Sequence, residues 1–372
     1  MPDISIVVPR LDEKPWGGRT LETYGFDLPE GTAIGEALVT AGDAAIATGL
    51  GADGTLGDIV TGDPAGRLGA RATKAVGGRE IFPLLVKLID AAQNLSIQVH
   101  PNDEQAAPLD RLGKTEAWHV LAAEPGSRLY VGLRPGVSYE DFAAAARKLD
   151  GSSASLLRAL EAKPGTTILL PAGTIHALGA GVMVYEIQQP SDVTFRLDDW
   201  GRVDANGNPR EMHLEQGFAV GLPDLRPDFI EPIEIAGGRL LVATRYFALE
   251  RFEIAAGSTR EQSGSGSPQV VTVLSGELTV ANATETETLA AGHSVVIWPD
   301  TDGSVALGAR TDVVALRSWV PDLAADIVAA ARAAGASDAA IAAIGSPLAD
   351  VANVLAGQLS AGSGSGASPS GS

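Results

Sequence analysis

The sequence predicts a mainly β protein with a short helical insert and a helical C-terminal segment. Hydrophobic residues make up 45% of the 372 residues, and 44 Gly and 22 Pro are spread among them. Short apolar runs separated by Gly and Pro are typical of many short strands joined by turns. A chain of this length is also long enough to form two or three domains with a sizeable core.

Residues 1–235 contain several strand-like runs and one helical pattern, and we expect them to form one domain. Around SYEDFAAAARKLD apolar residues recur at helical spacing, which predicts a helical insert near residues 139–162. The strand-like runs are IFPLLVKLID, LSIQVH, TTILLPA and VMVYEIQQ.

Residues 236–320 repeat the β pattern and predict a second, smaller barrel. Within them AAGHSVVIWPD loosely echoes KPGTTILLPAG of the first half, which indicates an internal duplication. The echo contains no counterpart of His176, so we expect this second barrel to be metal-free. Residues 321–359 are Ala-rich and should form short helices, whereas residues 360–372 are Gly- and Ser-rich and should be disordered.

Charge and composition narrow the classes of partner. A total of 27 Lys and Arg against 46 Asp and Glu gives a formal net charge of −19, which opposes binding to nucleic acid or to an anionic membrane. The absence of cysteine excludes disulfides and thiolate metal sites. The N-terminus has no secretory signal pattern, and Asp326, Arg332 and Asp338 interrupt the Ala-rich stretch and argue against a membrane span. We therefore expect a cytoplasmic protein, and the sequence leaves its oligomeric state open.

Three separate segments carry candidate metal ligands. Gln98 and His100 are two residues apart in the extended run LSIQVHPND, so their side chains leave the same face of a strand. GKTEAWHVL adds the carboxylate of Glu116, and PAGTIHALG adds His176 just after a turn. Nitrogen and oxygen donors that converge on one point suit a zinc ion. We expect one Zn²⁺ per chain, although the same donors accept cobalt or manganese.

The segments LSIQVHPND, GKTEAW, PAGTIHAL and EIQQPSDVTFRLDDWGR, with KPWGGR near the N-terminus, together resemble the type I mannose-6-phosphate isomerases. These are zinc enzymes built on tandem cupin (jelly-roll) β-barrels, and the resemblance covers about residues 9–202. It implies that the zinc ligands are Gln98, His100, Glu116 and His176. It also implies that Arg196 is the active-site arginine and that Lys87, Lys114 and Glu186 belong to the substrate pocket.

The resemblance implies an isomerase that interconverts mannose 6-phosphate and fructose 6-phosphate. A proton would move between carbons 2 and 1 through an enediol-like intermediate, with zinc and Arg196 stabilising the negative charge that develops. The base stays open among Glu186, Lys114 and a zinc-bound water. Lys87 and Lys114 are candidates for binding sugar hydroxyls, and Arg202 is a candidate for the phosphate at the pocket mouth.

Each of these residues also has a structural interpretation. Arg196 would form an ordinary ion pair with Asp198 or Asp199, and Lys87 would extend outward to solvent. Glu116 would be a surface acid paired with Lys114, and Glu186 a buried acid of the barrel wall. At the level of function, the alternatives are a non-catalytic, metal-containing cupin that binds sugar phosphate and a metal-dependent cupin oxygenase.

Overall fold

The computed structural model describes residues 2–203, 207–300 and 303–363, and antiparallel sheets form its framework. A seven-stranded sheet and a five-stranded sheet make the first jelly roll. In spatial order the seven strands are β14 (Phe229–Ile230), β10 (Thr167–Leu170), β7 (Glu116–Ala123), β12 (Val182–Gln188), β5 (Leu85–Ala91), β3 (Ile34–Thr40) and β2 (Arg10–Gly18). The five strands are β13 (Phe195–Asp198), β6 (Ile97–Val99), β11 (His176–Leu178), β8 (Arg128–Leu133) and β9 (Leu157–Glu161).

The second jelly roll is built from an eight-stranded and a four-stranded sheet. The eight strands are β15 (Ile233–Ile235), β16 (Gly238–Ala243), β17 (Ala248–Ile254), β24 (Val313–Trp319), β19 (Gln269–Ser275), β22 (Ser294–Ile297), β1 (Ile4–Val8) and β4 (Ala45–Gly49). The four strands are β18 (Thr259–Ser263), β23 (Ser304–Ala309), β20 (Glu277–Ala281) and β21 (Thr286–Ala290). The predicted mainly β, tandem-barrel fold is therefore confirmed.

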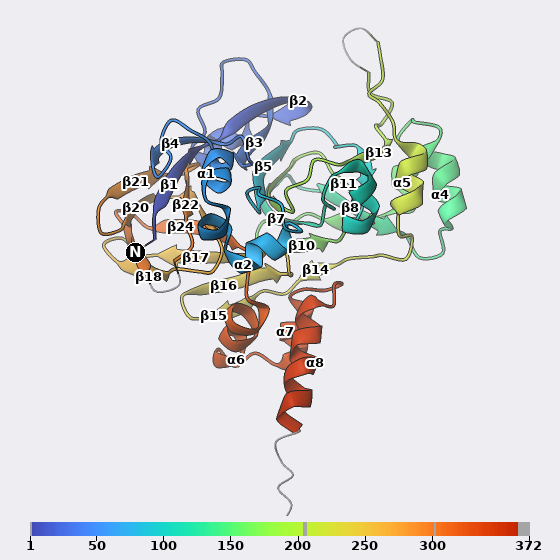
Figure 1. Cartoon of the computed structure of the whole chain (residues 1–372). Coiled ribbons are helices and arrows are strands. Elements are labelled where there is room, and N and C mark those ends of the chain that lie inside the picture. Colours follow the sequence, from blue (N-terminus) through green and yellow to red (C-terminus); the bar gives the residue numbers. More distant parts are fainter. Residues whose placement is uncertain (1, 204–206, 301–302, 364–372) are drawn as a thin grey trace, which may run out of the picture.

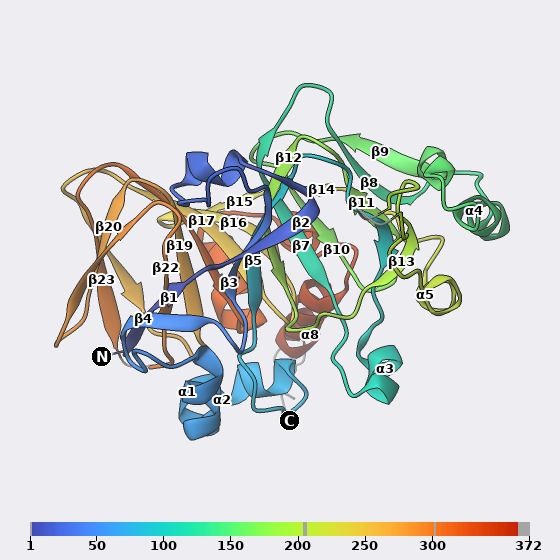
Figure 2. The ribbon, with the colours of Figure 1, turned by 90° about the horizontal axis from the view of Figure 1, so that it is seen from above.

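The two jelly rolls pack back to back, so that four sheets lie in parallel layers (Figure 2). Apolar residues fill each gap between layers because strand side chains alternate between the two faces of a sheet. In β12, Val182 and Val184 belong to the core of the first jelly roll, whereas Tyr185 and Ile187 belong to the cluster shared with the second. A separate cluster fills the second jelly roll.

Helices are short and lie outside the sheets. They are the 3₁₀ helices η1 (Thr20–Tyr24), η2 (Ala107–Leu109) and η3 (Ser152–Leu156), the π-helix η4 (Leu323–Ala329), and α1 (Leu56–Gly62), α2 (Pro64–Ala75), α3 (Asp103–Ala106), α4 (Tyr139–Ala146), α5 (Leu214–Val220), α6 (Ala330–Ala333), α7 (Asp338–Ala343) and α8 (Asp350–Ser363). The helical insert is shorter than the predicted 139–162, since residues 157–161 are the edge strand β9. Its apolar residues pack with α5 on the outer face of the five-stranded sheet.

Helices α1 and α2 were not predicted from the sequence. Their start signals are nevertheless present. Thr55 and Asp58 form a capping box, and Asp63 caps α2 with Pro64 at its first position. The two jelly rolls do not follow the order of the chain on either side of residue 235. Strands β1 and β4 precede that residue but pair within the eight-stranded sheet of the second jelly roll.

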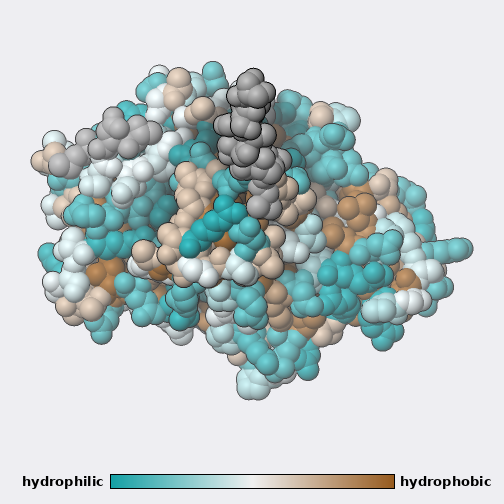
Figure 3. Space-filling view, turned by 90° about the horizontal axis from the view of Figure 1, so that it is seen from below, coloured by the Kyte–Doolittle hydropathy of each residue, from teal (hydrophilic) through white to brown (hydrophobic). Residues whose placement is uncertain are grey.

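The C-terminal helices lie below the sheets, against the ends of both jelly rolls (Figure 1). From below, this face is mostly hydrophilic, with hydrophobic residues in scattered patches (Figure 3). Helix α8 continues to residue 363, and residues 364–372, most of the tail predicted to be disordered, lie outside the described residues. Within the described ranges, no helix combines the length and apolarity needed to cross a membrane.

Candidate metal centre and active site

The candidate site residues point into the first jelly roll, and strand alternation explains why. In β6, Ile97 and Val99 belong to the outer cluster under α4, so Gln98 between them faces inward. In β7, Trp118 and Val120 belong to the inner core, which places Glu116 on the same inner face. Ala177 of β11 packs outward, so His176 also faces inward. Strands from both walls of one barrel thus aim polar side chains at a common interior.

His100, Glu116 and His176 converge in that interior. Their ligand atoms all lie within 4.8 Å of one another, and all three side chains are buried. His176 Nε2 lies 3.1 Å from Glu116 Oε1, and His100 Nε2 lies 3.6 Å from Glu116 Oε2. The rings of the two histidines are 5.0 Å apart between centroids. Three ligands predicted from separate segments therefore come together.

Both imidazoles are fixed with one nitrogen turned toward the shared centre. His100 Nδ1 donates to the carbonyl of Val193 at 2.9 Å, and His176 Nδ1 donates to the carbonyl of Thr174 at 2.8 Å. In the neutral rings Nε2 then presents a lone pair. His100 Nε2 and both carboxylate oxygens of Glu116 are buried without a hydrogen-bond partner among the described residues. Lone pairs that face one another at such distances fit a bound cation.

The charges at this centre suit metal binding. Burial and the nearby Lys114 hold the pKa of His100 well below its usual range, so the ring is neutral. Burial alone would raise the pKa of Glu116, but its polar neighbours, with the charge of Lys114 the largest effect among them, outweigh burial and hold the pKa well below its usual range. Lys114 Nζ lies 3.0 Å from Glu116 Oε2. The centre therefore offers an ionised carboxylate beside the neutral ring of His100.

Gln98 and Arg196 extend the same inner face. Gln98 pairs in register with His176 on one side and with Arg196 on the other, so the three residues form a row across β11, β6 and β13. The amide nitrogen of Gln98 lies 3.4 Å from His176 Nε2. A ligand role requires the amide oxygen at this position, which a half-turn of the amide group provides.

Arg196 does not form the ion pair that the structural interpretation supposed. Its Nη1 donates to the carbonyl of Glu211 at 2.6 Å, and its Nε is buried without a hydrogen-bond partner among the described residues. Asp199 instead binds Arg210 and Arg202, while Asp198 accepts from Ser153 and from backbone amides. Arg196 thus keeps donor capacity on the inner face of the barrel.

On the seven-stranded sheet, basic and acidic side chains alternate in a row across neighbouring strands. Lys87 Nζ lies 3.2 Å from Glu186 Oε1 and 3.7 Å from Glu36 Oε1, and Lys14 Nζ lies 3.2 Å from Glu36 Oε2. Burial lowers the pKa of Lys87, but Glu186 and Glu36 outweigh it and raise the pKa above its usual value. Lys87 is therefore a cation that faces the interior, and it does not extend outward to solvent.

Arg202 is held by two neighbours, the backbone of Asn94 and the carboxylate of Asp199. One guanidinium nitrogen donates to the carbonyl of Asn94, and another lies 3.4 Å from Asp199 Oδ1. The same Asp199 binds Arg210, and the charges of Arg202 and Arg210 both act on Arg196. Three arginines thus gather around one aspartate next to the row that contains Gln98.

Sequence reasoning missed Trp118 and Glu36 as parts of the site. Trp118 Nε1 donates to Glu186 Oε2 at 2.7 Å, and its ring packs edge-on against His176 at 5.3 Å between centroids. The available signals were the two-residue spacing of Trp118 from Glu116 and the carboxylate in the run IGEALVT. The remaining histidines lie elsewhere or play other parts. His119 bonds to Thr167 Oγ1, His213 Nδ1 accepts from the Arg196 amide, and His293 is exposed.

Comparisons with known proteins agree with this geometry. Residues 6–117 match the model of the phosphomannose isomerase type I catalytic domain. The chain is 32% identical to the mannose-6-phosphate isomerase ManA of Bacillus subtilis over 68% of this chain and 80% of that protein. It is 30% identical to the mannose-6-phosphate isomerase of Streptococcus mutans over 83% of this chain and 96% of that protein.

Solved structures share the fold. The mannose 6-phosphate isomerase of Bacillus subtilis has a TM-score of 0.73 and 26% identity, covering 86% of this chain and 99% of that one. A zinc-bound mannose 6-phosphate isomerase has a TM-score of 0.66 and covers 85% and 99%, and its 18% identity shows the fold alone. The matched relatives, the jelly-roll pair and the buried ligand cluster agree, and the chain belongs to the type I mannose-6-phosphate isomerases.

Proposed function

We propose that this enzyme uses one zinc ion per chain to interconvert mannose 6-phosphate and fructose 6-phosphate. The observation that carries the proposal is the convergence of His100 Nε2, His176 Nε2 and the Glu116 carboxylate, in which His100 Nε2 and both carboxylate oxygens have no hydrogen-bond partner among the described residues. These three residues and Gln98 would hold the ion. The zinc-bound relative supports this choice of metal. A bound zinc ion would supply Lewis acidity that polarises the sugar carbonyl and favours the enediol-like intermediate.

Arg196 would stabilise the negative charge that develops on the sugar oxygens. It stands next to Gln98 on the inner face, and its Nε has no hydrogen-bond partner among the described residues. A fixed guanidinium costs no reorganisation when the charge appears, which is the basis of electrostatic stabilisation of a transition state.

Glu186 is our choice for the base that moves the proton between carbons 2 and 1. Lys87 is cationic and Lys114 is paired with Glu116, whereas Glu186 is an inner-wall carboxylate whose Oε1 has no hydrogen-bond partner among the described residues. Trp118 Nε1 fixes its Oε2, and Oε1 faces Lys87. In this arrangement Lys87 and Lys114 would bind and orient sugar hydroxyl groups.

The phosphate group would lie toward Arg202. Arg196, Arg202 and Arg210 concentrate positive charge in a chain of net charge −19, and Asp199 offsets only part of it. Guanidinium groups suit phosphate oxygens through charge-assisted hydrogen bonds. Replacement of Arg202 by Ala should raise the KM for mannose 6-phosphate while the metal content stays unchanged.

A coupled assay of fructose 6-phosphate formation, run beside elemental analysis, tests the proposal. We expect turnover in proportion to zinc content, close to one ion per chain when fully active. Glu186→Gln should abolish exchange of the carbon 2 proton with solvent but leave the zinc in place. Full zinc occupancy without turnover in the unmodified protein would favour a non-catalytic cupin that binds sugar phosphates. The cytoplasmic location expected from the sequence remains part of this proposal.

A further inference from the structure

Residues 113–115, which precede Glu116, each donate a hydrogen bond from the backbone amide. The amide of Gly113 donates to Asp103 Oδ1 at 2.9 Å, that of Lys114 to the carbonyl of Pro101 at 3.0 Å, and that of Thr115 to Gln189 Oε1 at 2.9 Å. Three successive donors are thus taken by groups outside the strand that follows. This segment carries Lys114, so its backbone sets where the ammonium group lies.

Asp103 and Gln189 form the hub of this arrangement. Gln189 Nε2 donates to Asp103 Oδ1 at 2.9 Å, and the backbone amide of Gln189 donates to the carbonyl of Thr115 at 3.1 Å. Gln189 therefore forms hydrogen bonds with both the backbone amide and the backbone carbonyl of Thr115. A Cβ at position 113 would lie 2.5 Å from backbone atoms of Asn102 and Asp103, so the close approach requires Gly113.

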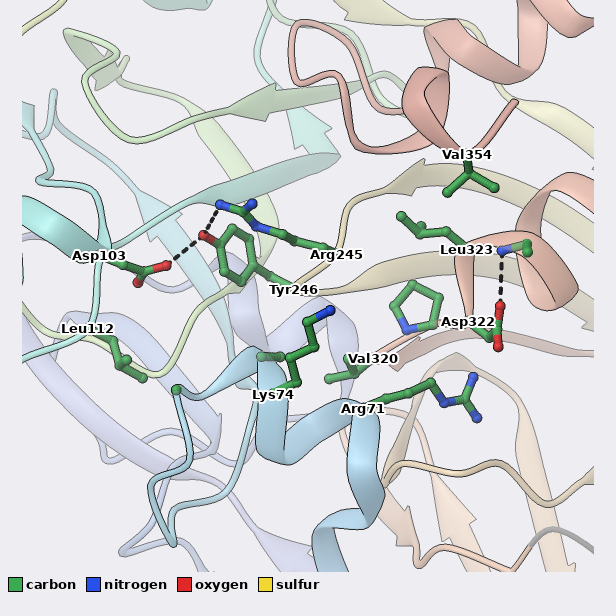
Figure 4. A pocket seen from close by; sticks show the side chains of 14 residues that line it. Arg71, Lys74, Asp103, Leu112, Arg245, Tyr246, Val320, Asp322, Leu323 and Val354 are labelled. Carbon is green, nitrogen blue, oxygen red and sulfur yellow. Dashed lines mark hydrogen bonds between the residues drawn. The ribbon is translucent and has the colours of Figure 1, made fainter. Parts of the chain in front are cut away.

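The hub is anchored in the second jelly roll. Tyr246 lies in the turn between β16 and β17, and its hydroxyl donates to Asp103 Oδ2 at 2.6 Å (Figure 4). Burial and the Asp103 hydrogen bond raise the pKa of this hydroxyl to about 12, so it stays protonated as a donor.

The turn itself is locked from two sides. Thr244 Oγ1 accepts from the amide of Tyr246 at 3.1 Å. Arg245 stacks over the Tyr246 ring at 4.8 Å and donates to its hydroxyl at 2.7 Å. Asp103, Arg245 and Tyr246 together line one side of a cavity of about 590 Å³ that extends to the C-terminal helices. The hydroxyl of Tyr246 is therefore a hydrogen-bond donor in a fixed position, and it belongs to the second jelly roll.

We propose that Tyr246, Asp103 and Gln189 are positioning residues that act through the 113–115 backbone on Lys114. The hydrogen-bond chain runs from the second jelly roll to Gly113 and Thr115, which flank Lys114, and the Lys114 ammonium lies 3.0 Å from Glu116. This inference rests on the proposed role of Lys114 in binding substrate. The second jelly roll then contributes to catalysis, because it provides Tyr246, the fixed end of this series of hydrogen bonds.

The test compares Tyr246→Phe with Tyr185→Phe in the zinc-loaded full chain. Tyr246→Phe removes the hydroxyl but keeps the ring. Tyr185 is the matched control, because its buried hydroxyl also joins the two jelly rolls, through Ser318 Oγ at 2.9 Å. It lies on the face of β12 opposite to Glu186. Gln189→Met serves as a second variant that removes the side-chain hydrogen bond to Thr115 at similar side-chain volume.

The first readout is independent of activity. Amide hydrogen exchange in peptides that contain residues 112–116 should become about tenfold faster in Tyr246→Phe and Gln189→Met, as expected for the loss of one hydrogen bond. Tyr185→Phe should leave these peptides unchanged. Equal exchange rates in all variants would overturn the inference even if mannose 6-phosphate turnover is normal. Absence of turnover in the unmodified protein would instead contradict the proposed function and leave this readout intact.

The second readout separates positioning from general stability. The kcat per bound zinc should fall about tenfold in Tyr246→Phe, with KM changed less than kcat. In a Lys114→Met background the same substitution should have almost no further effect on kcat, because both changes act on one group. Additive losses, or a loss of kcat equal to that of Tyr185→Phe, would return Tyr246 to a merely structural role.

Discussion

Two histidines whose Nδ1 atoms are bound to backbone carbonyls define the candidate metal centre at the level of single residues. Val193 and Thr174 provide those carbonyls, and both lie within the motifs EIQQPSDVTFRLDDWGR and PAGTIHALG that the sequence singled out for other residues. The sequence predicted the ligands because their residue types and order are specific. It did not predict which ring nitrogen would face the centre, since that depends on backbone carbonyls, one from a distant segment for His100 and one two residues earlier for His176.

Loss of either histidine should remove metal and activity together. His100→Ala and His176→Ala each delete a donor with a preset orientation, so we expect metal affinity to fall by at least about tenfold. His293→Ala is the matched control, because His293 is exposed and distant in the second jelly roll. Elemental analysis of the purified variants checks this, and full zinc content in His100→Ala would contradict the ligand assignment.

Arg196→Ala should reduce turnover while the metal stays bound. Its donor capacity faces the interior, and removal of one preorganised donor to a developing charge typically costs a factor of about 10² to 10³ in kcat. Steady-state kinetics and metal content measured on the same sample separate the two effects. Arg158→Ala, which removes an arginine of the edge strand β9, should behave as the unmodified enzyme. Near-normal turnover in Arg196→Ala would leave Arg196 with a structural role only.

At the level of elements, alternation along each strand decided which charges face the pocket. Lys87 and Glu186 interrupt apolar runs, and the sequence already marked both as unusual. Only the register of β5 against β12, which sets the two residues opposite each other, shows that they pair. Glu36 joins them because β3 pairs with β5, a contact that no local pattern encodes.

Strand β7 also carries a histidine whose protonation should affect stability. Burial, with the charge of Arg251, lowers the pKa of His119 to about 4, against about 6.5 for an unfolded chain. Between these values the unfolded state binds more protons, so stability is lost as pH falls from about 6.5 to 4. The difference in pKa corresponds to about 3 kcal/mol.

Denaturant unfolding at several pH values checks this effect. The free energy of unfolding should fall more steeply with acid in the unmodified protein than in His119→Asn, which lacks the titrating ring. His293→Asn should keep the full pH dependence, because His293 is exposed. Parallel curves for the unmodified protein and His119→Asn would contradict the assigned cause.

At the level of the whole molecule, the N-terminal strand belongs to the second jelly roll. β1 lies between β22 and β4, and Ile4 and Ile6 are part of the second core. The sequence predicted a boundary near residue 235 from a change of pattern along the chain. It did not reveal that residues 4–8 and 45–49 join the sheet of the second jelly roll. Both halves consist of short apolar strands, so the sequence pattern does not show to which half a strand belongs.

Deletion of residues 1–8 should therefore destabilise the half that is most distant in sequence. The loss exposes one edge of β22 and one edge of β4, with the apolar residues behind them, so we expect the melting temperature to fall by at least about 5 °C. Deletion of residues 364–372 is the control and should leave the melting temperature unchanged. Equal melting temperatures for the two deletions would contradict the pairing of β1 with β22.

The sequence by itself determined the fold class and the family, and it predicted the candidate metal ligands. These properties depend on local patterns, namely short apolar runs, turn residues and motifs whose residue types suit one chemistry. The tertiary structure alone decided the shared centre of His100, Glu116 and His176, the charge row from Lys14 to Glu186, and the chain from Tyr246 to Thr115. Each joins residues from strands or turns far apart in the chain, and register and packing between sheets bring them within hydrogen-bond distance.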